Sequence, residues 1–63
     1  MKDLEKLITY YRKRVEMYKV NAEKQTGEGE KAYRLGIAEG YENAADELEK
    51  VNRDITKKIT DLI

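Results

Sequence analysis

Four acidic residues in the second half of the chain recur at a spacing that places their carboxylates on one face of a helix. They step by three, four and three positions: Glu39, Glu42, Asp46 and Glu49. Carboxylates in such a stripe could hold a metal ion or bind a basic partner. Because the chain has no histidine and these side chains are too spread out to share one ion, we expect no metal site. The stripe is either a solvated helix face or a candidate surface for a protein partner.

A second cluster combines aromatic and basic side chains, as surfaces that bind single-stranded nucleic acid do. Two tyrosines, Tyr10 and Tyr11, are followed directly by Arg12, Lys13 and Arg14. Consecutive helical residues point in different directions, however, and the 13 basic residues of the chain are balanced by 13 acidic ones. We therefore regard the three basic residues as a further candidate partner surface and do not favour nucleic acid as the partner.

The residue types on which most catalytic sites depend are missing from the sequence. It contains no cysteine, histidine or serine, and nothing groups the remaining nucleophiles with an activating base. The pattern Gly27-x-Gly29-x-x-Ala32 matches a loose dinucleotide-binding fingerprint, but that motif requires a preceding strand. We expect a protein that is not an enzyme and that binds no cofactor and no small-molecule substrate.

The composition also bears on where the protein acts. No stretch approaches the ~20 apolar residues that span a bilayer, and the N-terminal segment lacks the apolar run of a signal peptide. We therefore expect a cytoplasmic protein without a membrane partner. A bias towards Lys, Ile, Tyr, Asn and Met is typical of AT-rich genomes, which suits a small phage, mobile-element or bacterial protein.

One break divides the chain, and it lies in the segment Thr26-Gly27-Glu28-Gly29. Gly27 is expected to close the first helix as a left-handed C-cap. Glu28 and Glu30 would then lie favourably at the positive end of the second helix. The sequence thus predicts one domain over 1–63, with a first helix over about 2–25, a loop over 26–29 and a second helix over about 29–63.

Both predicted helices carry apolar residues at heptad spacing. In the first, the steps alternate between four and three along Leu4, Ile8, Tyr11, Val15, Tyr18 and Ala22. In the second, the steps alternate between three and four along Ala38, Tyr41, Ala45, Leu48, Asn52, Ile55, Ile59 and Leu62. Ile37, Ala44 and Val51 flank the second series, one heptad apart. Such regularity predicts coiled-coil-like packing.

A short loop makes neighbouring helices antiparallel, so the predicted fold is all-α, an antiparallel two-helix hairpin. Bulky Tyr11 and Tyr18 should meet small residues of the second helix. Gly36, Gly40 and Ala44 form a small-residue ladder, which we interpret as close helix packing beneath these tyrosines or across a dimer. The expected register also predicts two charge pairs, Lys6 with Glu49 and Lys13 with Glu42.

The second helix should outrun the first by about ten residues, or on the order of 15 Å. An uncovered apolar stripe on a small protein usually marks an interaction surface. The predicted self-association residues are Val51, Asn52, Ile55, Ile59, Leu62 and Ile63. We expect a homodimer in which two hairpins form a four-helix bundle. Asn52 either fixes the register of that packing or meets water at the end of the bundle.

The expected function follows from these surfaces. We expect a small non-enzymatic protein-binding modulator, an inhibitor or adaptor, that acts as a helical homo-oligomer. A purely structural oligomerisation module is the first alternative, and a nucleic-acid-binding accessory protein is the second.

Overall fold

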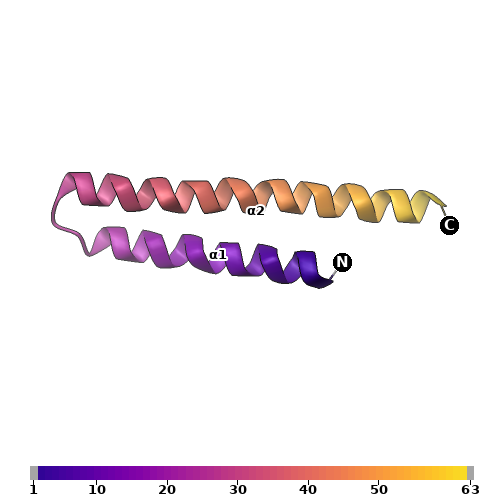
Figure 1. Cartoon of the computed structure of the whole chain (residues 1–63), viewed down its shortest axis with the longest axis horizontal. Helices are drawn as coiled ribbons and strands as arrows, with labels where there is room; N and C mark the ends of the chain where they lie inside the picture. The colour runs from indigo at the N-terminus through magenta and orange to yellow at the C-terminus, as the bar shows by residue number, and fades with distance from the viewer. Residues whose placement is uncertain (1, 63) are drawn as a thin grey trace.

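The protein is a long, narrow hairpin of two antiparallel helices (Figure 1). The computed structural model describes residues 2–62, in which α1 spans Lys2–Glu23 and α2 spans Glu28–Leu62. The Cα atoms extend over 55 × 15 × 11 Å, so the molecule has two broad faces on which both helices are seen side by side. The predicted all-α, two-helix fold is confirmed.

The first helix ends two residues earlier than predicted, because a glutamine side chain helps to close it. Backbone amides of Lys24 and Gln25 donate to the carbonyls of Asn21 and Ala22, at 3.2 and 3.1 Å. The Gln25 Nε2 also donates to the Asn21 carbonyl, at 3.3 Å. These bonds satisfy carbonyls that the end of a helix leaves without partners. The chain therefore leaves α1 at Glu23.

The predicted role of Gly27 as a left-handed C-cap is wrong. No glycine among residues 2–62 has a positive φ, and Gly27 lies at the start of α2 instead. Its carbonyl accepts the first helical hydrogen bond, from the amide of Lys31 at 3.1 Å. The acidic residues expected at the positive end of α2, Glu28 and Glu30, do lie in its first turn.

The buried core lies on a single heptad position of each helix. The buried side chains recur every seven residues: Ile8, Val15 and Ala22 in α1, and Ala38 and Ala45 in α2. Ala38 is 1% exposed and Ala45 is 0% exposed. The other half of each series is only half-buried: Leu4, Tyr11 and Tyr18 in α1, and Tyr41, Leu48 and Ile55 in α2. One side of the seam between the helices is therefore closed, and the other is open.

The small residues that allow the helices to approach are alanines, not the predicted glycines. A Cβ atom built on Gly36 or Gly40 meets nothing within 4 Å, and both glycines are exposed. Ala44 is half-buried. The prediction that Gly36 and Gly40 pack closely beneath the tyrosines of α1 is thus wrong, because their heptad positions lie away from the line of contact. Their suggested use across a dimer stays a prediction.

We expect Gly36→Ala to raise the free energy of unfolding by about 1 kcal/mol. Alanine has the higher helix propensity, and the space around Gly36 is open, so the gain carries no steric cost. Urea denaturation followed by circular dichroism at 222 nm measures the change. A loss of stability would mean that a neighbour absent from the isolated hairpin occupies this space.

Candidate functional site

One broad face of the hairpin is held together by ion pairs, and we call it the polar face. The Arg12 Nη2 lies 2.8 Å from Asp46 Oδ1 and 2.9 Å from Glu49 Oε1. Next to it, Lys19 Nζ lies 3.9 Å from Glu42 Oε2. The polar face thus consists of these five residues, all of them at least one-third exposed at the side chain. Pairs so exposed contribute only ~0–1 kcal/mol each.

Some residues of the predicted partner surface lie together on the polar face, and the others lie elsewhere on the hairpin. Arg12 joins two members of the acidic stripe, and its hydrogen bonds to Glu49 and Asp46 raise the pKa of the guanidinium above its ordinary value. Lys13 is exposed and points away from α2, and Arg14 belongs to the opposite face. Glu39 is exposed and has no ion pair with another described residue. The use of these residues by a partner stays a prediction.

The two charge pairs predicted from the register are wrong. Glu49 pairs with Arg12 rather than Lys6, and Glu42 pairs with Lys19 rather than Lys13. The reason lies in the helical period. Arg12 and Lys19 follow buried residues by four positions and therefore flank the contact, whereas the two lysines precede buried residues by two positions and point away.

A row of tyrosines lines the opposite side of the seam. Tyr41 of α2 lies between two tyrosines of α1, with ring centroids 5.5 Å from Tyr11 and 5.8 Å from Tyr18. The Tyr18 and Tyr41 rings are stacked, with 16° between their planes. Such pairs contribute about 0.5–1.5 kcal/mol beyond the burial of their area. All three rings remain half-exposed.

Arg14 extends this aromatic row at its α1 edge. Its Nε donates to the Tyr10 hydroxyl at 2.9 Å, and its guanidinium carbon lies 5.1 Å from the centre of that ring. Tyr10 in turn lies 5.9 Å from Tyr11. The hydrogen bond to Tyr10 raises the pKa of Arg14 above its ordinary value. Arg14 is therefore a fixed cation beside exposed apolar surface.

An open groove of about 290 Å³ runs between the helices beside this row. Five residues line it: Tyr11, Ile37, Gly40, Tyr41 and Ala44. Gly40 is exposed and the other four are half-buried. We use the name aromatic face for these five residues together with Tyr10, Arg14 and Tyr18.

The aromatic face and the polar face lie on opposite broad sides of the hairpin. At 100° per residue, Ala44 lies about 100° to one side of Ala45, while Glu49 lies about 40° to the other side. Ion pairs cross the seam on the second side, and the groove beside the tyrosine row lies on the first side. A smaller hollow of about 120 Å³ lies between the helices near the turn. Two exposed residues extend the open side along the hairpin: Leu7 lies one heptad before Arg14, and Val51 lies one heptad after Ala44.

Beyond the start of α1, the last turns of α2 have no neighbouring helix (Figure 1). We call residues 56–62 the C-terminal overhang. Ile59 is 53% exposed and Leu62 is 87% exposed. Of the other predicted self-association residues, Val51 is exposed, Asn52 and Ile55 are half-buried, and Ile63 lies outside the described residues.

Asn52 lies in the seam, as its heptad position predicts. Its Oδ1 is buried and accepts no hydrogen bond from any described residue. A buried acceptor that stays without a partner costs roughly 1–3 kcal/mol. Whether Asn52 fixes the register stays a prediction.

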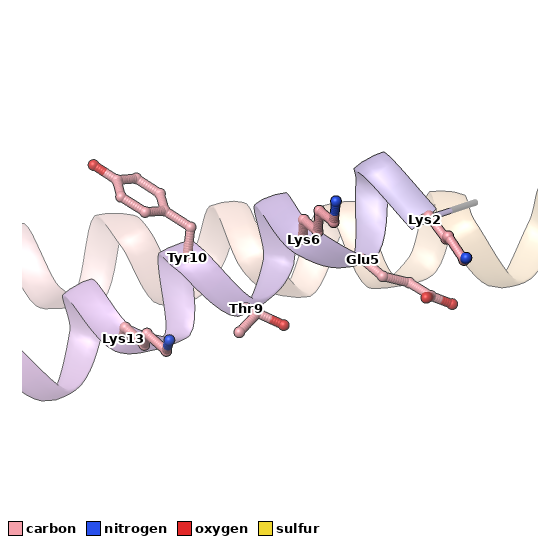
Figure 2. A pocket seen from close by; sticks show the side chains of 6 residues that line it. All are labelled: Lys2, Glu5, Lys6, Thr9, Tyr10 and Lys13. Atoms are coloured by element: carbon pink, nitrogen blue, oxygen red, sulfur yellow. The ribbon is translucent and has the colours of Figure 1, made fainter.

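A surface depression of about 610 Å³ on α1 provides no catalytic arrangement. Its six lining residues all come from one helix: Lys2, Glu5, Lys6, Thr9, Tyr10 and Lys13. Figure 2 shows that their side chains fan outwards rather than converge on a common point. Within residues 2–62, no three carboxylates are grouped to hold a metal ion. Neither described helix is long and apolar enough to cross a membrane.

Comparisons with models of protein families, with curated proteins and with solved structures give no match to this chain. The surfaces themselves therefore carry the functional argument.

Proposed function

We propose that this chain is a non-enzymatic protein-binding module that acts as a helical homo-oligomer, in a coiled-coil-like four-helix bundle. The observation that carries the proposal is the C-terminal overhang. Ile59 and Leu62 stand on the same heptad series that packs against α1 earlier in the helix, yet they have nothing to pack against. Leaving such side chains in water forgoes about 1.5–3 kcal/mol each.

The small size of the core supports the same proposal. A chain of 63 residues buries only ~60% of the surface that its unfolded form exposes, and small domains often compensate by association. Three of the five buried side chains here are alanines, which contribute little apolar area. Association would supply the burial that the hairpin lacks.

Replacing Ile59 and Leu62 together by glutamate is expected to weaken self-association. The charges would have to be buried wherever the overhangs meet another copy. Light scattering coupled to size-exclusion chromatography, over a hundredfold range of concentration, measures the mass of the parent chain and of the variant.

Thr56→Glu combined with Thr60→Glu is the matched control. It adds the same charge to the same turns at two exposed positions outside the heptad series, on the flank that Glu42 and Glu49 occupy. We expect this control to keep the parent mass. A parent chain that is monomeric at every concentration contradicts the proposed function.

A modulator and a purely structural module both fit this geometry, and one observation favours the structural module. Three of the four carboxylates in the predicted acidic stripe already pair with α1. Those carboxylates can recruit a basic partner only by giving up these ion pairs. A modulator would have to use surface that the oligomer leaves exposed, such as Glu39 and Lys13.

A further inference from the structure

We propose that the aromatic face is covered by the aromatic face of a second copy of this chain, with α1 of each copy lying across α2 of the other. This inference rests on the proposed self-association and names the surface and the geometry that produce it. The open side of the seam is the feature that requires a cover, because the tyrosine row lies half-exposed between the helices.

The area of this side is what a dimer needs. The Cα atoms of this side extend over 55 × 15 Å, roughly 800 Å² when the C-terminal overhang, where α2 lies alone, is counted with the two-helix part. A standard interface buries about that area on each partner. The centre of the patch is rich in tyrosine, with an arginine at its edge, and these residue types dominate the energetics of interface cores.

The net charges of the two helices favour a second copy of this chain as the partner, with unlike helices stacked on each other. Helix α1 has six basic and four acidic residues, a net charge of +2, while α2 has six basic and nine acidic ones, a net charge of −3. Stacking α1 on α2 of the partner brings opposite charges together on both sides of a twofold axis parallel to the helices. Stacking like helices would oppose α1 to α1.

One charged residue on each rim agrees with this orientation. Arg14 marks the α1 rim of the aromatic face, and Glu47, two turns beyond Gly40 and one turn beyond Ala44, marks the α2 rim. The antiparallel register, seen where Arg12 meets Asp46, places Arg14 and Glu47 within about one turn of each other along the axis. A twofold axis parallel to the helices preserves that level and sets each Arg14 opposite the Glu47 of the other copy.

The same axis also accounts for the C-terminal overhang. Both overhangs then leave the bundle at one end, where the apolar side chains of the two copies can meet. All neighbouring helices are antiparallel in this arrangement, as in up-and-down four-helix bundles. The dimer would thus cover the groove and the overhang together.

Lysines placed in the groove test which face is buried. Gly40→Lys with Ala44→Lys puts two charges into the aromatic face, while Gly36→Lys with Asn43→Lys puts the same two charges on exposed positions facing away from α1. Both variants replace a glycine in open space, so each hairpin should remain helical at 222 nm. We expect the groove variant to raise the dimer dissociation constant by roughly a hundredfold or more, and the control to leave it within about threefold.

The outcomes separate this inference from the proposed function. A parent dimer that both variants leave intact would overturn the aromatic face as the interface while keeping self-association. A parent chain that is monomeric throughout would overturn both. Equal weakening by the groove variant and the control would indicate a general charge effect and would also overturn the assignment of this face.

A single spin label tests the orientation, because the chain has no native cysteine. Thr60→Cys, labelled and measured by double electron–electron resonance, reports the distance between the two overhangs. We expect a distance on the order of 20 Å, as across the diagonal of a four-helix bundle. A distance of about 50 Å would place the overhangs at opposite ends, as in a stack of α2 on α2, and would overturn the proposed axis.

Discussion

Replacing Ala45 with leucine should destabilise the hairpin by about 1–3 kcal/mol, a large part of the stability of so small a chain. Ala45 is 0% exposed and stands on the heptad position where the two helices touch. Three added heavy atoms cannot be accommodated there unless α1 moves away from α2. Such a shift would also disturb the ion pairs between Arg12 and the carboxylates of Asp46 and Glu49, which follow Ala45 by one and four residues.

Urea denaturation followed at 222 nm measures this loss, and Ala32→Leu is the matched control. Ala32 is exposed on α2, so the same chemical change there should alter stability by no more than about 0.5 kcal/mol. Equal effects at the two positions would show that leucine itself, rather than the close approach of the helices, determines the result.

Truncating Tyr41 to alanine should remove about 2–4 kcal/mol of stability, less than for a fully buried aromatic residue because the ring is half-exposed. Tyr41 is the residue that joins the tyrosine row, since it contacts rings from two successive heptads of α1. Its loss leaves Tyr11 and Tyr18 without their α2 partner. We expect the near-ultraviolet circular dichroism of the tyrosines to fall together with the melting temperature.

Two further variants separate the ring from other effects. Tyr41→Phe keeps both aromatic contacts and should retain most of the stability. Tyr33→Ala removes a tyrosine that is 67% exposed and should have little effect on folding. A Tyr41→Ala chain as stable as the Tyr33→Ala chain would contradict the structural role of the tyrosine row.

The heptad series carries most of the information about this fold. Alternating steps of three and four place Ile8 and Val15 on one line along the first helix and Ala38 and Ala45 on one line along the second, and the structure buries all four. Periodicity alone does not distinguish the two halves of each series. In the structure the two halves differ in burial, and the ion pairs of Arg12 and Lys19 cross the seam on the side of the buried half. The sequence feature that indicates the open side is the flanking series Ile37, Ala44 and Val51, because its first two members line the groove.

Two local features could not be read from residue types. A glycine after a helix often signals a left-handed cap, but Gln25 bonds to the Asn21 carbonyl and the Gly27 carbonyl accepts the first hydrogen bond of the next helix. Small residues at four-residue spacing often indicate close packing, but repeated steps of four depart from the heptad's alternating threes and fours, and Gly36 lies away from α1. In the first case a side-chain contact outweighed the local preference, and in the second the heptad period did.

The four-residue turn between the helices has a consequence for how copies can exchange parts. No described residue of the turn has a left-handed backbone conformation, so the reversal of the chain is not enforced by glycine geometry. If residues 24–27 became helical, α1 and α2 would join into one rod of about 90 Å. In such a rod, α1 could pack on α2 of another molecule with the same side chains that it uses within the hairpin. Domain swapping would then keep every contact of the seam and change only the turn.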